Sequence, residues 1–555
     1  MHKTMDETLS RRAALRRADA EPLASRMADF DGHNAYASDP VLTAALDGAP
    51  DEDTEEDLKA YGAYWGSADA QEVARLAVAY PPQLRREDFE GRRIDQMEMH
   101  PAYHALTNRA VAAGLTSSAW EESDSGRQHS LRAAVLYLTA GCERGHLLPV
   151  SATHAAVAAL AYAPELEAEL FPLIASRRYD RHAVPSEDKD GILITLAIAE
   201  RVHSDTGLLT RGELAAGDTV RITGEKAFVC QPQADFVLTL AMTTDGPTAA
   251  MVARHAPENV DAVRVDGLSE FGGLEAQAIA TMRLEEARGR LIGEPGRGRQ
   301  VLRDVRTLTE LDSTTIAAGT VRRAVARAVH ALRTRHAHGR PLLEDPLHAR
   351  LAADLALTSA AQTALAIRLA AAFDRAFERD GDHAVARVLT PAARIFALKS
   401  AIPVLAEARD ITAPAGLSRH HPAARAGTDI AALDQWDGNA NAAAADLVAL
   451  IGRDRNVLGD ALQELGGDLG SQNSDLVDRT LTLAREAQTD PGLARAFADQ
   501  LAMVGAAAAM RRNLPRVVAD AFISARLRGG YTAQHATLDS RFDAAAIVEF
   551  TMPED

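Results

Sequence analysis

One change of pattern constrains the fold of this chain more than any other feature. Residues 191–295 carry short β-type apolar runs, and they lie between two long alanine-rich stretches. In those stretches apolar residues recur every three or four positions, as in amphipathic helices. In the middle segment, continuous apolar runs such as 191–198 and 235–241 are separated by turn residues such as Asp245-Gly246. This order predicts a mainly α protein with a central β domain.

The chain has 555 residues, which is too long for a single hydrophobic core. The pattern divides it into an N-terminal arm (1–40), an N-terminal helical domain (41–190), a β domain (191–295), a helical bundle (296–450) and an additional C-terminal helical domain (451–555). Long helices are predicted at 300–336, 346–379, 382–410 and 440–453. The β domain is expected to be a small barrel or sandwich, and residues 91–93 and 121–122 are expected to be polar connectors.

Charge and cysteine content exclude several classes of protein. The formal net charge is -18, and residues 451–555 hold 11 Arg and no Lys against 15 Asp and Glu. This negative charge argues against binding to DNA or to an anionic membrane. Only Cys142 and Cys230 are present, so no disulfide framework is expected and a cytoplasmic location is predicted. No apolar run of membrane-spanning length stands out, and no histidine cluster has metal-ligand spacing.

The stretch 433–441 breaks the helical pattern of the second alanine-rich region. It places Asp437 beside an indole and before Gly438, and two asparagines follow. An acid on a glycine-flanked turn can be held against a ligand with few steric limits. The alternative is an ordinary helix–helix loop whose Asp and Asn residues cap the next helix. The residues alone leave both interpretations open.

Several short motifs, in this order, resemble the acyl-CoA dehydrogenase superfamily. They are Gly224-Glu225-Lys226 with Ala234-Asp235, the glycine-rich loop 293–298, Arg335-His336-Ala337-His338-Gly339, and Trp436-Asp437-Gly438. Segments 81–84, 91–95, 100–104, 120–122 and 390–394 resemble its adaptive-response, AidB-like branch. The resemblance covers about residues 35–530. It implies an N-terminal α domain, a small β barrel, a C-terminal helical bundle and an extra C-terminal helical domain. It also implies a homotetramer with FAD between the β domain and the bundle.

The resemblance implies catalytic roles for two carboxylates. Asp437 stands at the family's catalytic glutamate, which removes a proton from an acyl thioester while the flavin accepts a hydride. Aspartate is shorter by about 1.5 Å, and a misplacement of about 1 Å can cost about a hundredfold in rate. A repositioned substrate, or chemistry like that of the related nitroalkane oxidases, is therefore expected. Glu310 is the second candidate base; its alternative role is a solvent-facing helix glutamate.

The resemblance also assigns cofactor-binding positions, with several departures. Ser204, Arg335, Gly438 and Asn441 match the pattern. Cys230 stands where a serine or threonine would bond the flavin, and a thiol is a weaker donor. Further departures are Ala227 in place of a flavin-facing tryptophan, His338 in place of a phenylalanine, and Ala413-Pro414 in place of two glycines.

Three functions therefore stay open. The first is an FAD-dependent oxidoreductase of acyl-CoA dehydrogenase type, with Asp437 and Glu310 as its acids and a specialised small molecule, such as an acyl thioester, as its substrate. The second is a flavin-free relative that binds a ligand or a partner. The third is a nitroalkane-oxidase-like flavoenzyme or an alkylation-response protein.

Overall fold

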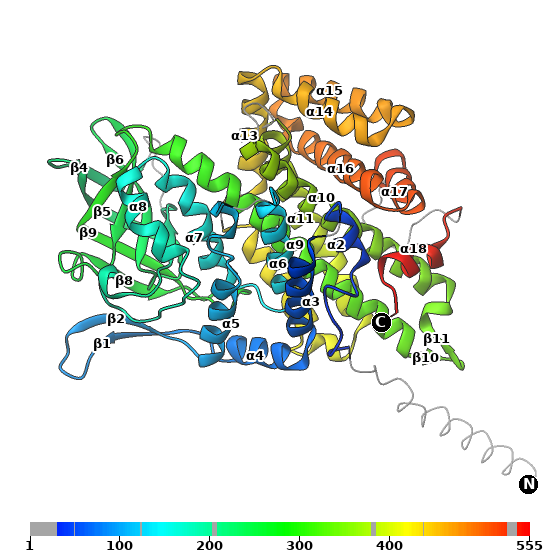
Figure 1. The fold of residues 1–555 in the computed structure, drawn as a ribbon, viewed down its shortest axis with the longest axis horizontal. Helices are drawn as coiled ribbons and strands as arrows, with labels where there is room; N and C mark the ends of the chain where they lie inside the picture. Colours follow the sequence, from blue (N-terminus) through cyan, green and yellow to red (C-terminus); the bar gives the residue numbers. More distant parts are fainter. Residues whose placement is uncertain are drawn as a thin grey trace, which may run out of the picture.

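The computed structural model describes residues 30–48, 50–122, 125–201, 208–378, 384–436, 438–529 and 541–554. Asp437 and Ser204, two of the predicted site residues, lie outside this described part. The element order confirms a mainly α fold with a central β barrel, and Figure 1 shows the barrel at one end of the molecule beside the helices.

Helices dominate the N-terminal region, and polar caps set where several of them begin. They are α2 (Pro40–Ala45), α3 (Glu52–Gly66), α4 (Ala68–Ala79), α5 (Pro101–Ala112), α6 (Gln128–Ala140), α7 (Leu147–Leu160) and α8 (Pro164–Ile174). The side chains of Asp39, Asp51 and Ser67 accept hydrogen bonds from backbone N–H groups in the first turns of α2, α3 and α4. Those N–H groups have no partner within the helix, so each cap stabilises a helix start.

The prediction that residues 91–93 form a connector is wrong, because they lead into a β-hairpin of β1 (Gln83–Glu87) and β2 (Arg93–Glu98). The Asp88 carboxylate closes the turn by accepting hydrogen bonds from the backbone N–H groups of Glu90 and Arg92, both at 2.9 Å. Asp95 anchors the hairpin, since its Oδ2 accepts from the N–H of Val265 at 2.9 Å. The hairpin thus extends the β region beneath the barrel (Figure 1).

The β domain closes into a barrel. Its strands are β3 (Ile194–Ala197), β4 (Arg211–Leu214), β5 (Thr219–Cys230), β6 (Phe236–Thr243), β7 (Gly246–Ala253), β8 (Val263–Leu268) and β9 (Ile279–Ile292). The order β6-β4-β5-β9-β7 returns to β6 through the β6–β7 pairing, while β3 pairs with β6 and β8 with β9. Because the strand pairing closes on itself, the domain is a barrel and not a sandwich.

A buried ion pair lies inside the barrel and joins Lys226, of the family-like motif Gly224-Glu225-Lys226, to Glu200. Lys226 is 0% exposed, and its Nζ lies 3.0 Å from Glu200 Oε1 and donates to the Leu240 carbonyl at 2.8 Å. Burial raises the pKa of Glu200, but hydrogen bonds from Thr210 and its neighbours outweigh it and hold that pKa at about 2. Lys226 and Glu200 therefore stabilise the barrel, since a buried charge persists only with a partner.

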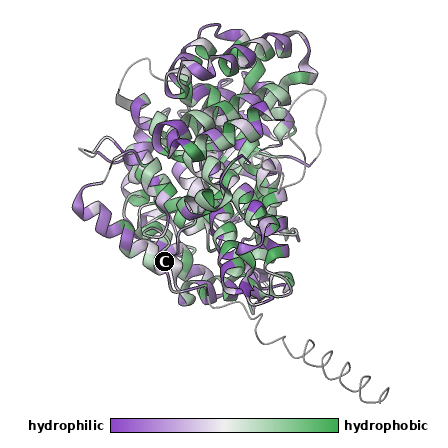
Figure 2. Ribbon diagram, turned by 90° about the vertical axis from the view of Figure 1, so that its right-hand side faces the viewer, coloured by the Kyte–Doolittle hydropathy of each residue, from purple (hydrophilic) through white to green (hydrophobic). Residues whose placement is uncertain are grey.

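Long helices form the bundle: α9 (Gly298–Thr334), α10 (Pro346–Glu378), α11 (Ala384–Ile411), α12 (Pro422–Leu433) and α13 (Ala440–Arg453). Among the described helices, α10 and α11 are long and apolar enough to cross a membrane by length and composition alone. However, 94% and 72% of their most apolar windows are buried. In Figure 2, hydrophobic and hydrophilic residues are interspersed along the helices. Helices α10 and α11 are the core of the bundle.

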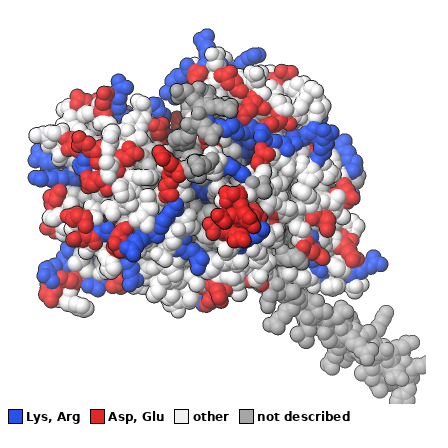
Figure 3. Space-filling view, viewed as in Figure 1, with Lys and Arg blue, Asp and Glu red and all other residues white. Residues whose placement is uncertain are grey.

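The C-terminal region packs directly onto the bundle. It contains α14 (Val457–Leu469), α15 (Ser474–Thr489), α16 (Ala494–Asn513), α17 (Arg516–Phe522), a π-helical turn (Ile523–Arg528) and α18 (Ala544–Thr551). Helix α16 contacts α10 and α11 through a buried row of small residues, 505–509. A Cβ on Gly505 would lie 2.7 Å from Leu389 Cδ1, so glycine permits the close approach. On the face in Figure 3, acidic and basic side chains are interspersed.

Candidate active site

The turn between α12 and α13 is held in place by a buried arginine. Arg394 of α11 is 0% exposed, and its Nη2 donates to the backbone carbonyls of Asp434 and Gly438, each at 2.8 Å. The Asp434 carboxylate accepts from Lys399 Nζ at 2.5 Å. Gly438 has φ +109°, a conformation that favours glycine. The two ends of the predicted acid-bearing turn are therefore fixed to the bundle core.

The same turn reaches the barrel through Trp436. Burial raises the pKa of the Cys230 thiol to about 12, and a hydrogen bond with the Trp436 side chain opposes that rise. Cys230 is 5% exposed at the end of β5. Trp436 and Cys230 thus join the turn to the strand that the resemblance assigns to the flavin.

Glu310 lies beside this turn on α9. It is 5% exposed, so the solvent-facing alternative is wrong. Arg306, one turn earlier, places Nε 3.0 Å from Glu310 Oε1 and Nη1 2.7 Å from Asp446 Oδ2 on α13. A Cβ on Gly438 would lie 3.6 Å from Arg306 Nη2. The structure therefore brings Glu310, Arg306, Gly438, Trp436 and Cys230 to one junction of barrel and bundle.

An aromatic residue that the sequence interpretation missed also faces outward from β5. Ala227, the predicted substitute for the flavin-facing tryptophan, is 2% exposed, whereas Phe228 is 48% exposed. The pairing of β5 with β9 shifts register between Lys226 and Val229, and Phe228 has φ +57° within this bulge. Bulges often redirect a side chain next to a functional site. Phe228, whose ring lies 5.6 Å from that of Phe271, is therefore an exposed aromatic residue next to the buried Ala227.

Two predicted cofactor residues lie apart from this junction. Arg335 follows the end of α9, where Nη1 donates to the Ile411 carbonyl at 2.8 Å. Since an α-helix rises 1.5 Å per residue, Arg335 lies about 37 Å along the helix axis from Glu310. The Asn441 side chain is exposed, and Asn439 caps α13 by accepting from the N–H groups of Asn441 and Ala442. The capping expected of an ordinary loop is therefore present as well.

The second acid of the 309–312 segment is fully engaged elsewhere. Asp312 is 1% exposed and forms two hydrogen bonds with Arg132 of α6, at 2.6 and 2.8 Å. In the sequence, the only signal for this contact is that one helix carries an acid and another carries an arginine. Asp312 thus ties α9 to the N-terminal helices.

Comparison with known proteins agrees with this arrangement. The family model "Adaptive response protein AidB N-terminal domain" matches residues 26–181, and "Acyl-CoA dehydrogenase, C-terminal domain" matches residues 300–449. The chain is 30% identical over 515 residues to AidB of Escherichia coli (strain K12), covering 90% of this chain and 94% of that protein. It is 23% identical over 468 residues to acyl-CoA dehydrogenase family member 11 of Caenorhabditis elegans, covering 80% and 75%.

Solved structures share the fold. Caenorhabditis elegans ACDH-11 in complex with C11-CoA has a TM-score of 0.79 at 19% identity, covering 95% of this chain and 92% of that one. An acyl-CoA dehydrogenase of Bacillus anthracis complexed with FAD has a TM-score of 0.61 at 15% identity, covering 81% and 79%. With the extent and identity of the Escherichia coli match, these findings show that the chain belongs to the acyl-CoA dehydrogenase superfamily, in its AidB-like branch.

Proposed function

We propose that this protein is an FAD-dependent oxidoreductase of the acyl-CoA dehydrogenase type, acting on a specialised small molecule such as an acyl thioester. One observation carries the proposal. The buried Arg394 holds the turn of Trp436 and Gly438 to the bundle at both ends, and the Arg306–Glu310 pair of α9 lies beside Gly438. A carboxylate on a glycine-flanked turn at a domain junction suits proton abstraction.

The residues present fit the flavin ring. Phe228 offers an exposed aromatic face at a bulge, and Cys230 lies two residues further along the same strand. Cys230 is itself covered, and Trp436 shares a hydrogen bond with its thiol, so a bound flavin would meet the indole here. The flavin, when bound, supplies a hydride acceptor.

The side chains of this chain would divide the remaining work. Asp437 is the proposed base, and Glu310 is its partner or substitute. Arg306 forms ion pairs with both Glu310 and Asp446, and these fix the position of the buried Glu310 carboxylate. Arg394 fixes the carbonyls of Asp434 and Gly438, which flank the sequence position of the proposed base.

The distance between Arg335 and Glu310 supports an oligomer. An arginine about 37 Å along α9 from the catalytic carboxylate is too remote to serve the same flavin ring. We propose that Arg335 binds the diphosphate of FAD held by a neighbouring copy, as the homotetramer of the family would require. Gel filtration with light scattering should give four copies, and a monomer that retains FAD would contradict this assignment.

A second candidate is a flavin-free relative that binds a ligand or partner. The burial of Cys230 favours it, because the thiol expected to meet the flavin is only 5% exposed. Pro414 also lacks an N–H where the family pattern offers glycine. The shorter Asp437 keeps a nitroalkane-oxidase-like reaction as a further variant of the flavoenzyme.

The visible spectrum of the purified protein separates these candidates. The flavoenzyme should show the absorbance of oxidised flavin and be bleached by its substrate, whereas colourless protein that cannot be reconstituted with FAD would exclude it. Asp437→Asn should lower flavin reduction by about a hundredfold or more while flavin content stays constant. Glu310→Gln is the matched variant: if it alone abolishes reduction, the base is Glu310.

A further inference from the structure

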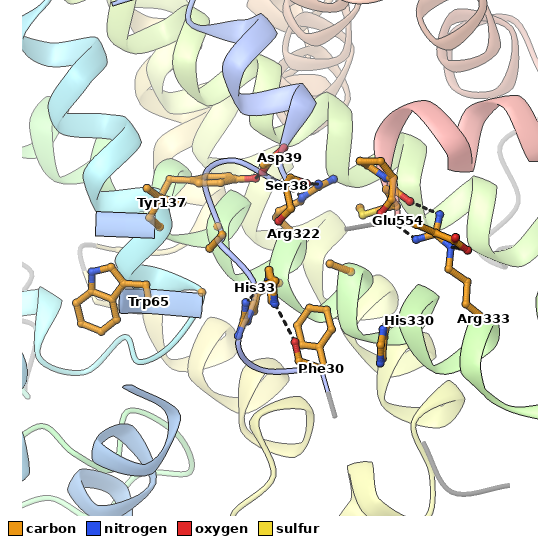
Figure 4. Close-up of a pocket in the computed structure, with 18 of the residues that line it drawn as sticks. Phe30, His33, Ser38, Asp39, Trp65, Tyr137, Arg322, His330, Arg333 and Glu554 are labelled. Atoms are coloured by element: carbon orange, nitrogen blue, oxygen red, sulfur yellow. Dashed lines mark hydrogen bonds and ion pairs between the residues drawn. The ribbon is translucent and has the colours of Figure 1, made fainter. Parts of the chain in front are cut away.

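A second hollow lies further along α9, away from the candidate active site. It has a volume of about 400 Å³ and is enclosed by residues 30–39, by α3 and α6, by the second half of α9 and by the C-terminal tail. Figure 4 shows Phe30, His33, Tyr137, Arg322, His330 and Arg333 placed around this space. Arg323 lines this hollow and lies about 20 Å from Glu310 along the axis of α9.

Positive charge exceeds negative charge beside this cavity, in a cluster made of Arg323, which lines the cavity, and of Arg327 and Asp31 behind it. Arg323 and Arg327 are 8% and 6% exposed, and both donate from Nη2 to one oxygen, Asp31 Oδ1, at 3.0 and 2.8 Å. Of the carboxylates in the described part of the chain, only Asp31 forms an ion pair with either guanidinium. Two buried cations therefore share one anion, and an uncompensated buried charge is costly.

The other arginines at the cavity are matched. Arg322 Nε lies 3.0 Å from Asp39 Oδ2, and its Nη1 donates to the Thr551 carbonyl. Arg333 binds the carbonyls of Met552 and Pro553, so the C-terminal tail forms one wall. The positive excess is thus confined to Arg323 and Arg327.

Arg323 also retains an unsatisfied donor. Its Nη1 contacts His33 Nε2 at 2.6 Å and its Nη2 contacts Asp31, but its Nε is buried without a hydrogen-bond partner. A buried N–H that lacks an acceptor is destabilising. Because Arg323 lines the cavity, an anion that entered it would lie beside this guanidinium and balance the local charge.

The remaining walls are apolar and aromatic. The Phe30 ring lies under both guanidiniums, 4.6 Å from Arg323 Cζ and 4.7 Å from Arg327 Cζ. Trp65, Tyr137, Leu138 and Ala326 line the cavity further along. A purely inorganic anion would leave this surface uncovered, whereas an organic anion would bury its body against it.

We propose that this cavity binds an organic monocarboxylate with an apolar body, its carboxylate meeting Arg323 and its body the aromatic walls. One negative charge equals the local excess. The volume is that of a small ligand site. The site is separate from the candidate active site and does not rest on the proposed function.

Calorimetric titration of the full-length protein with decanoate tests the proposal, with decanol as a probe of similar shape without the charge. One decanoate should bind per chain, and decanol should bind at least tenfold more weakly. Equal affinity for both would overturn the role of the arginine pair.

Two variants locate the binding. Arg323→Gln should weaken decanoate at least tenfold, and Arg303→Gln, which removes an exposed arginine from the same helix, should leave it unchanged. Ala326→Phe fills the cavity without altering any charge and should also abolish binding, with melting temperature and flavin content as checks of folding. Unchanged decanoate affinity in both Arg323→Gln and Ala326→Phe would overturn the proposal.

Discussion

The two ends of α9 use arginine in opposite ways. Near its start, one guanidinium, Arg306, contacts two carboxylates, Glu310 and Asp446. In its second half, two guanidiniums, Arg323 and Arg327, share the single carboxylate of Asp31. Between them, Asp312 and Arg132 pair one to one. A single helix therefore presents an acid-rich site, a neutral contact and a cation-rich cavity in turn.

This difference indicates what each region can do. An excess of carboxylate near the turn of α12 and α13 suits a group that accepts a proton, and an excess of buried guanidinium suits a group that receives an anion. The matched pair between them has neither excess, so we expect it to contribute to folding alone. Variants at the three places can separate these roles.

The largest effect is expected at the matched pair. Asp312→Asn would leave Arg132 buried and uncompensated at 2% side-chain exposure, so the free energy of unfolding should fall by about 3–5 kcal/mol. The midpoint of urea unfolding measures this loss.

The double variant Arg132→Met with Asp312→Leu provides the control. It removes both charges, so it should recover most of the lost stability. A double variant as unstable as Asp312→Asn would show that the pair is not the source of the effect.

A smaller effect, on rate rather than stability, is expected at the acid-rich end. Arg306→Met removes the cation that fixes the buried Glu310 carboxylate, and the rate of flavin reduction should fall about tenfold to a hundredfold. Flavin content should not change. Asp446→Asn removes the exposed partner of the same arginine, at 67% exposure, and should alter the rate by about twofold at most. Equal losses in both variants would mean that Arg306 acts through α13 instead.

Much of the fold could be predicted because local pattern decides it. The helices predicted at 300–336, 346–379 and 440–453 correspond to α9, α10 and α13 within a few residues, since their apolar spacing and caps are local. The β1–β2 hairpin was missed because its strands are polar and exposed, and its anchor, Asp95 on Val265, spans the sequence. Strands β4 and β8 were missed because charged residues interrupt their apolar pattern.

The candidate site was harder to predict than the fold. The resemblance located Glu310, Cys230 and Gly438, yet nothing in the pattern indicated that Arg306 or Arg394 would complete the junction. The exposed Phe228 was not anticipated, because it lies in a bulge and period-two alternation cannot anticipate a bulge. Charge sharing across α9 depends on contacts between distant segments, which sequence spacing does not encode.

The smallest expected effect concerns pH at the cation-rich end. The pKa of His421 is lowered to about 4, first by burial and then by Arg327 and Arg425. Because the folded-state pKa lies below the ordinary 6.5, the unfolded chain binds this proton first, and His421 lowers stability as pH falls from about 6.5 to 4. Arg327→Gln should raise that pKa, so the variant should lose less stability than the parent protein over this range.

Unfolding midpoints at pH 7 and pH 4.5 measure the difference, and in a His421→Asn background the benefit of Arg327→Gln at low pH should vanish. If the benefit persists there, the excess charge of the arginine pair acts on another group.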